Sequence, residues 1–234
     1  MKDEPFPFKD NGDGTTSDNC TGLMWEKRDD AGGIHDVVNR YSWAGCCDGD
    51  CGSYPNYLGC QPNAAAAAAC SAQTGGAVGC SQCSVGTCKV NPLGYEAITT
   101  IWDWLVQVNA EGGVGFAGHS DWQLPSEEGC ISCWEPYRCP CGPAELESIL
   151  LTPYTSPSPC RTSPCIDPIF GLTASWYYWS GSTNYPAYPN EAFFVHFGHG
   201  GAGIWHKGSG THVRAVRGGS PSGAFLDVAT AALD

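Results

Sequence analysis

Four histidines in the last quarter of the chain are the first residues whose type and spacing could do chemistry. His196, His199, His206 and His212 lie in or beside a glycine-rich stretch, and a pair three positions apart can chelate zinc. No Asp, Glu or Cys nearby completes a ligand set, and histidine is also an ordinary contact residue of binding surfaces. We therefore expect neither a metal site nor a cofactor here.

The cysteines point to oxidative chemistry. The chain holds fifteen among 234 residues, which a reducing cytosol would leave as unpaired thiols. Two Cys-x2-Cys spacings match zinc knuckles, but an acidic, lysine-poor chain with so many cysteines favours a disulfide framework. Fifteen is odd, so at least one is free or pairs with another chain. The candidates are Cys20, Cys46, Cys47, Cys51, Cys60, Cys70, Cys80, Cys83, Cys88, Cys130, Cys133, Cys139, Cys141, Cys160 and Cys165.

Acidic residues do not complete a catalytic or calcium site. Asp10, Asp13 and Asp18 lack the spacing and terminal Glu of an EF-hand loop. His119 and Asp121 could act as acid and base, but both residue types commonly hydrogen-bond within turns. The sequence shows no nucleophile elbow, phosphate-binding glycine loop or paired-carboxylate cleft. We expect a protein that is not an enzyme.

Charge and hydropathy exclude several partners. A formal net charge of -13 repels phosphate backbones, so nucleic acid, anionic membranes and sulfated glycans are disfavoured. No segment approaches the roughly 20 apolar residues of a membrane span. The cysteines indicate an extracellular or cell-surface location, and we expect that an export signal has been trimmed.

Periodicity predicts the elements that must position these residues. A hairpin is expected over residues 8–25, turning at Asp13-Gly14, and helices over 95–110 and 143–151. A short helix over 64–69 would follow Asn63. In the strand around 193–197, alternation puts Phe193, Val195 and Phe197 towards the core and displays Phe194 and His196.

The expected organisation is one domain over residues 1–219 and a tail over 220–234. Cysteine-rich insertions at about 44–92 and 127–143 interrupt the domain. Residues expected in its core are Trp25, Trp122, Trp179, Val195 and Phe197.

Several motifs in one order resemble a known family. They are FKDNGDGTTSDNCTGLMWEK, GFAGHSDWQLP, ELESIL, YYWS, AFFVHF and VRAVRGG. Together they resemble the DUF1566 family, also called the Lcl C-terminal domain. The resemblance implies an α+β, C-type-lectin-like fold, with a twisted antiparallel sheet and two helices, related to formylglycine-generating enzymes. Those enzymes use a cysteine pair in the active cleft, and no cysteine follows Cys165 here.

Some members of that family are variable proteins of diversity-generating retroelements, in which a C-terminal face is diversified for ligand binding. The residues that match their fixed scaffold are Ala192, Phe193, Val195, Phe197, Gly200, Lys207 and Val213 to Arg217, with Ala202 in place of a Val. The open positions between them would hold the contact residues and converge on one exposed surface. Ordinary lectin-fold binding without diversification remains an alternative.

The expected function is therefore that of a receptor-like or adhesin-like protein that binds a protein or glycan on another surface. The alternative is an extracellular structural or adhesive component whose cysteine-rich insertions make subunit contacts, with a homo-oligomer possible in either case. The expected contact residues are Tyr185, Tyr188, Asn190, Phe194, His196, Gly198, His199, Gly201, Gly203, Ile204, Trp205, His206, Ser209 and Thr211.

Overall fold

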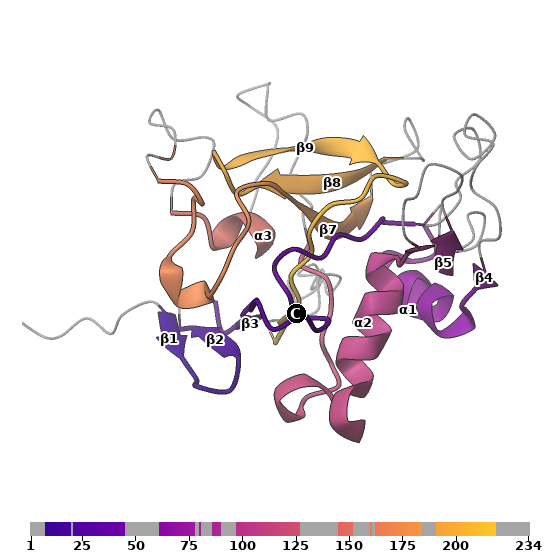
Figure 1. Cartoon of the computed structure of the whole chain (residues 1–234), viewed down its shortest axis with the longest axis horizontal. Helices are drawn as coiled ribbons and strands as arrows, with labels where there is room; N and C mark the ends of the chain where they lie inside the picture. Colours follow the sequence, from indigo (N-terminus) through magenta and orange to yellow (C-terminus); the bar gives the residue numbers. More distant parts are fainter. Residues whose placement is uncertain are drawn as a thin grey trace, which may run out of the picture.

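A computed structural model describes the parts of the chain that build a mixed fold of helices and antiparallel sheets. The described residues are 8–19, 21–44, 61–77, 80, 86–89, 97–126, 145–151, 160, 162–183 and 191–218. Figure 1 shows the sheet β7-β8-β9 across the top, the hairpin β1-β2 below it, and helices α1 and α2 side by side. The α+β class expected from the sequence is confirmed.

The first sheet joins the two ends of the described chain. It consists of β1 (Phe8–Asp10), β2 (Thr15–Asp18), β3 (Met24–Glu26) and β10 (Val216–Arg217), in that spatial order. The expected opening hairpin is confirmed, because β1 pairs antiparallel with β2 across a turn in which Gly14 adopts a φ of 89°. Since β10 pairs with β3, the VRAVR motif is anchored beside the opening hairpin.

Two further sheets have three strands each. One contains β4 (Gln61–Pro62), β5 (Gly86–Lys89) and β6 (Ala97–Ile98). The other contains β7 (Tyr177–Thr183), β8 (Glu191–His196) and β9 (Gly201–His206), with β8 in the middle. This last sheet carries half of the expected contact residues.

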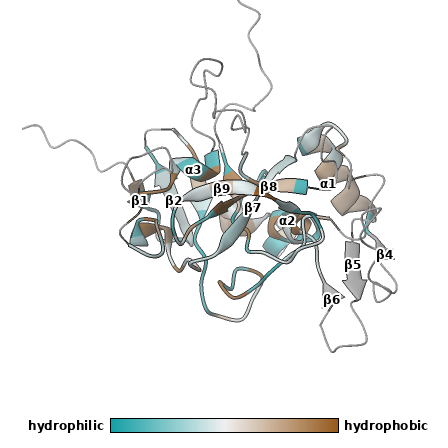
Figure 2. Cartoon of the chain, turned by 90° about the horizontal axis from the view of Figure 1, so that it is seen from above, coloured by the Kyte–Doolittle hydropathy of each residue, from teal (hydrophilic) through white to brown (hydrophobic). Residues whose placement is uncertain are grey.

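Helix α1 (Ala64–Thr74) begins where the sequence predicts and is longer than expected. The side chain of Asn63 accepts hydrogen bonds from the backbone amides of Ala65 and Ala66, which are donors that the first turn leaves unsatisfied. Its alanine run gives it the apolar colouring seen in Figure 2. The helix packs on α2 through Ala66 and Cys70, which are fully buried.

Helix α2 (Ile101–Ala110) starts six residues later than the predicted start at residue 95. Thr100 caps it in a reciprocal capping box with Asp103, and the preceding Ala97–Ile98 pairs with β5 instead. Ile98 therefore belongs to a strand and not to the helix. The error arises because its spacing fits a helix, whereas its strand partner comes from a distant segment.

The remaining helices are short. The predicted helix over 143–151 is observed as α3 (Glu145–Ser148), and the three apolar residues expected in its core face, Leu146, Ile149 and Leu150, are buried. Single 3₁₀ turns occur as η1 (Glu111–Gly113), η2 (Phe116–Gly118) and η3 (Pro168–Phe170). No helix in the described ranges is long and apolar enough to cross a membrane.

The core has two clusters on either side of the β7-β8-β9 sheet. The first gathers Trp43, Trp102, Trp104 and Trp179 with α1 and α2, and the second contains Trp25, Val195 and Phe197 with α3. The five residues predicted for the core are all buried. The alternation predicted along β8 is only partly correct: Phe193, expected to face the core, is half-buried, and His196, expected to be displayed, is buried. One end of the sheet nevertheless stays exposed to solvent, at Trp176 and Trp205.

Candidate functional site

The register of the β7-β8-β9 sheet determines which side chains share a face. Directly paired residues point the same way, and the pairs Tyr177 with His196 and Phe194 with Gly203 place three rings on one side. Trp205 joins the same side because it lies two residues beyond Gly203. Trp179, also on this side, is buried in the core. The face is therefore covered at one end and open at the other.

Six aromatic side chains meet at the open end, and we call them the aromatic face: Trp176, Tyr177, Phe194, His196, His199 and Trp205. Tyr177 lies at the centre, with ring-centroid distances of 4.6 Å to Phe194, 4.5 Å to His196 and 4.7 Å to Trp205. Trp176 contacts Tyr177 at 5.0 Å in an edge-on arrangement. Trp176 and Trp205 are 42% and 39% exposed. Edge-to-face packing stabilises such rings while leaving indole surface in water.

Two glycines make room for these rings. A Cβ at Gly203 would lie 2.8 Å from the tip of the Phe194 ring, and one at Gly198 would lie 2.5 Å from Cε1 of His196. Neither glycine has a positive φ. The reason for glycine at these positions is therefore space for the aromatic face rather than backbone conformation.

His196 and His199 form a parallel stack with ring centroids 3.9 Å apart. Nδ1 of His196 accepts the amide hydrogen of Gly198, and Nδ1 of His199 accepts that of Gly201. Because an amide can only donate, each neutral ring carries its own hydrogen on Nε2. Burial and the neighbouring His199 hold the pKa of His196 below its usual value. The stack therefore offers Nε2 hydrogens as donors, and a metal at Nε2 would require the opposite tautomer.

The structure brings some of the predicted contact residues together and separates others. Phe194, His196, His199 and Trp205 share the aromatic face, with Gly198, Gly201 and Gly203 beneath the rings. Ile204 and His206 lie on the opposite face, because side chains alternate along β9. The expected convergence on one surface is therefore only partial.

Other predicted contact residues lie elsewhere. Thr211 is 1% exposed and forms a bridge with Tyr41, so its side chain does not reach the surface. Ser209 is half-buried in the turn that follows β9. Tyr185, Tyr188 and Asn190 lie outside the described residues. Two members of the aromatic face, Trp176 and Tyr177, were not among the expected contact residues. Tyr177 joins the face because it pairs with His196 of β8, and Trp176 precedes it, with its carbonyl accepting the amide hydrogen of Phe197.

Most of the scaffold positions are buried, whereas Phe193 and Arg217 are only partly buried. Ala192, Val195, Phe197 and Lys207 are fully buried, as are Val213 to Val216. The ammonium of Lys207 lies 4.3 Å from the centre of the Trp43 ring, and burial lowers its pKa to about 8. Arg214 donates hydrogen bonds to the carbonyls of Glu26 and Phe170 at 2.7 and 2.6 Å. These residues hold the sheet in place and do not contact solvent.

A buried charge cluster anchors the same motif. Glu26 accepts hydrogen bonds from Arg28 at 2.9 Å, His35 at 2.6 Å and the amide of Ala215 at 2.8 Å. Burial alone would raise the pKa of Glu26, but Arg28 and His35 hold it below its usual value. Burial would likewise lower the pKa of His35, but its contacts with Glu26 and Glu111 raise it. Both ring nitrogens of His35 face carboxylates, an arrangement that favours the imidazolium form, in which both nitrogens donate.

The acids considered for calcium or catalysis are engaged separately. Asp10 pairs with Lys27, Asp13 accepts from Thr15, and Asp18 accepts from Thr21. Asp121 makes a two-bond ion pair with Arg217. Within the described residues, no group of three or more His, Cys, Asp or Glu side chains is placed to hold a metal ion.

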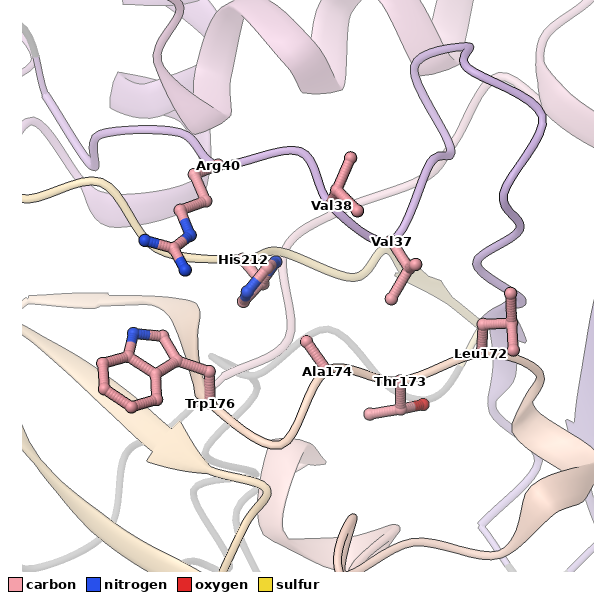
Figure 3. Close-up of a pocket in the computed structure, with 8 residues that line it drawn as sticks. All are labelled: Val37, Val38, Arg40, Leu172, Thr173, Ala174, Trp176 and His212. Carbon is pink, nitrogen blue, oxygen red and sulfur yellow. The ribbon is translucent and has the colours of Figure 1, made fainter.

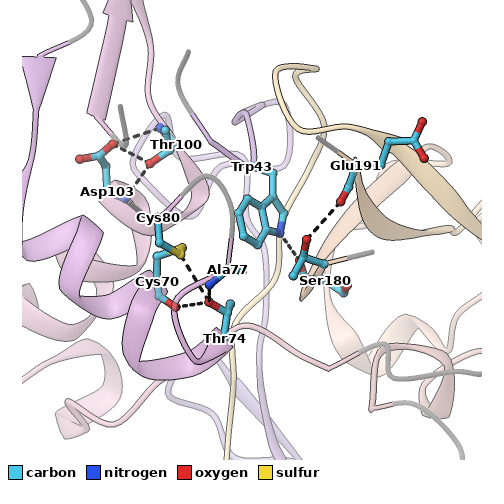
Figure 4. The surroundings of a disulfide bond; sticks show 10 residues. Trp43, Cys70, Thr74, Ala77, Cys80, Thr100, Asp103, Ser180 and Glu191 are labelled. Atoms are coloured by element: carbon cyan, nitrogen blue, oxygen red, sulfur yellow. Dashed lines mark hydrogen bonds between the residues drawn. A yellow bond between two sulfur atoms is a disulfide. The ribbon is translucent and has the colours of Figure 1, made fainter. Parts of the chain in front are cut away.

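Four of the fifteen candidate cysteines form two disulfides in the described part of the chain. Cys70 bonds to Cys80 at the end of α1, where the Thr74 hydroxyl contacts the Cys80 sulfur at 3.4 Å (Figure 4). Cys160 bonds to Cys165 before η3. Cys88 is described only as a backbone position in β5. Ten candidates lie outside the described residues: Cys20, Cys46, Cys47, Cys51, Cys60, Cys83, Cys130, Cys133, Cys139 and Cys141.

Comparison with known proteins identifies the family. A search of curated proteins found no significant match, and a search of solved structures found none either. The family model for the Lcl C-terminal domain matches residues 14–217, a range that extends from the opening hairpin to the end of β10. The chain therefore belongs to the Lcl C-terminal domain family.

Proposed function

We propose that this chain is a receptor-like or adhesin-like protein that binds a protein or glycan on another surface through the aromatic face. The observation that carries the proposal is the clustering of six rings, with Trp176 and Trp205 both more than one-third exposed. Exposed aromatic surface lowers solubility unless a partner covers it, and Trp and Tyr dominate the binding energy of interfaces. The face combines that apolar area with the exposed ring of His199 as a polar contact.

The disulfides and the net charge of the chain support the same proposal. Two disulfides are expected in an oxidising compartment, so we place the protein outside the cell or on its surface. The net charge of -13 disfavours sulfated or phosphorylated ligands. A neutral or basic protein surface or an uncharged glycan fits better.

We propose further that the fold is C-type-lectin-like and that the aromatic face is diversified by a retroelement. In support, fixed scaffold positions such as Val195 and Val213 are buried, while open positions such as His199 and Trp205 are exposed. His196, Thr211 and His212 are open positions that are nevertheless buried. Sequencing the neighbouring DNA tests the diversification. A reverse transcriptase gene and an imperfect repeat of the codons for residues 176–217 are expected, and their absence contradicts it.

The binding proposal is tested by replacing Trp205 with Ala. The protein is screened against an array of neutral and acidic oligosaccharides and a displayed library of extracellular protein domains. Trp205→Ala should weaken binding to any ligand found by ~2 kcal/mol or more, which is about thirtyfold. The melting temperature should change little, because the side chain is 39% exposed.

The matched control is Val114→Ala, which removes apolar surface from a side chain that is 64% exposed in the loop after α2. This variant should bind like the wild type. Equal effects of the two substitutions would contradict a role for the aromatic face. If the wild type forms a dimer and Trp205→Ala does not, the partner of the aromatic face is a second copy of the chain.

A further inference from the structure

A pocket of about 390 Å³ lies beside the aromatic face and is formed by segments far apart in the sequence. Residues 37–40 form one wall, residues 172–176 form the other, and His212 completes the pocket (Figure 3). The volume is within the range of small-molecule sites. None of the walls belongs to a regular helix or strand, so the pocket is a product of the tertiary fold.

The walls of the pocket are mainly apolar, and several of their large apolar side chains are exposed to solvent. Val38, Leu172 and Trp176 are 73%, 47% and 42% exposed, and they are three of the six large apolar side chains exposed in the described part of the chain. Single apolar side chains scattered over a surface need no explanation. Several exposed apolar side chains that line one concave site indicate that the site binds an apolar group. Ala174 points into the middle of the pocket, where a small side chain leaves space (Figure 3).

Arg40 supplies the single charge in this pocket. Its guanidinium points towards the indole of Trp176 and the ring of His212 in Figure 3. Among the described residues it has no hydrogen-bonded or ion-paired partner, although the chain carries a formal net charge of -13. Burial and the Arg40 charge lower the pKa of His212 to about 4, so His212 is neutral at pH 7. Among its eight lining residues, the pocket therefore presents one cation and no anion.

We propose that this pocket binds a small amphipathic carboxylate, with its apolar body between Val37, Leu172 and Trp176 and its carboxylate on Arg40. A guanidinium matches a carboxylate with two parallel hydrogen bonds. A phosphate would carry nearly twice the charge and leave part of it unpaired against an apolar wall. The site goes beyond the macromolecular contact surface proposed above, since it stands on residues outside that surface except Trp176.

The experiment measures binding of three probes with the same carbon chain. Octanoate, octylamine and octanol are titrated into the intact, oxidised protein by isothermal calorimetry. Octanoate should bind saturably at one site, and the cationic and neutral probes should bind at least about tenfold more weakly. Absence of saturable octanoate binding in the millimolar range overturns the proposal.

Three variants assign the binding to the pocket. Arg40→Gln should weaken octanoate binding about tenfold and leave octanol unchanged. Ala174→Leu should weaken both probes by filling the space for the apolar body. The matched control is Lys9→Gln, which removes one exposed cation on β1, outside the pocket, and should bind octanoate like the wild type.

Equal octanoate affinities of Arg40→Gln and Lys9→Gln would show that net charge alone attracts the probe, which overturns the proposal. Both variants avoid the aromatic face. Failure of this pocket proposal therefore leaves the Trp205 experiment interpretable, and failure of the Trp205 experiment leaves this one interpretable.

Discussion

Glu26 is a fully buried carboxylate whose charge is balanced within a few ångströms. Arg28 and His35 contact it, and Arg214 donates to its backbone carbonyl. A buried charge that loses one partner destabilises a fold strongly, because the remaining charge stays desolvated. The cluster therefore links the stability of β3 and of the VRAVR motif to the protonation of His35.

His35→Gln should change how stability depends on pH. The folded-state pKa of His35 is raised above 6.5, so its stabilising contribution is complete below pH 6.5 and is lost as pH rises through the raised pKa. The wild type should therefore lose stability from this residue above pH 6.5. The substitution should cost about 1–3 kcal/mol at pH 6 and flatten this slope. Denaturant unfolding across the pH range measures both effects.

The useful window for this measurement ends near pH 8. Lys207 has a folded-state pKa of about 8, lowered from 10.5, so its titration raises stability as pH increases above 8. A slope between pH 6.5 and 8 that is unchanged in His35→Gln would contradict the assignment to His35.

At the residue scale, the sequence predicts which side chains are buried better than it predicts which side chains form ion pairs. Trp122 and Phe197 are buried as their pattern indicates. The contacts of Glu26 with His35 and of Asp121 with Arg217 could not be predicted, because ion pairs carry no periodic signal. Asp121 was expected to hydrogen-bond within its own turn, yet its partner lies 96 residues away.

At the scale of elements, the end of β8 fixes the sheet against the second core cluster. Phe197 directly follows the strand, is fully buried, and packs edge-on against Tyr178 at 4.7 Å. Its amide also donates to the carbonyl of Trp176 at 2.9 Å. The strand register, and with it the aromatic face on the other side, depends on this anchor.

Phe197→Ala should destabilise the protein by ~3–5 kcal/mol, because it leaves a cavity in a well-packed core. Phe193→Ala is the matched control, with the same residue type and change on the same side of β8 but only partial burial. It should cost clearly less. Equal losses in the free energy of unfolding for the two variants would contradict the observed register.

Local signals explain which elements the sequence predicts. Asn63 and the alanine run specify the start of α1, and Asp13-Gly14 specifies the first turn. The early part of the predicted helix over 95–110 is wrong, because β6 depends on pairing with β5 across the chain. Four of the six members of the aromatic face were predicted, and Tyr177 was missed for the same reason, since it joins the face only through the pairing of β7 with β8.

At the scale of the whole molecule, the chain folds around two core clusters that share one sheet. The sequence predicts the fold class and the family, because ordered motifs extend over most of residues 14–217. It does not predict the pocket beside the aromatic face, whose walls come from residues 37–40 and 172–176. Cavities between loops form only when the whole chain is folded.

Disulfides should govern how the two sides of the molecule lose structure. Cys70–Cys80 closes a short loop at the end of α1, a helix of 11 residues that is too short to be stable alone. A disulfide contributes ~2–4 kcal/mol, so its reduction should loosen α1 before the β7-β8-β9 sheet, which no described disulfide joins. Hydrogen exchange at increasing reductant concentration measures the order.

The double variant Cys70→Ala/Cys80→Ala should show early exchange in residues 64–74 without any reductant, because the constraint on α1 has been removed. Cys160→Ala/Cys165→Ala removes the other described disulfide and should leave α1 protected, since that loop lies before η3.

Alkylation of the native protein without reductant, followed by mass spectrometry, should leave most of the fifteen cysteines unmodified. If most are alkylated, or if α1 and β8 exchange together on reduction, the disulfides are not what holds α1 and its surroundings in place.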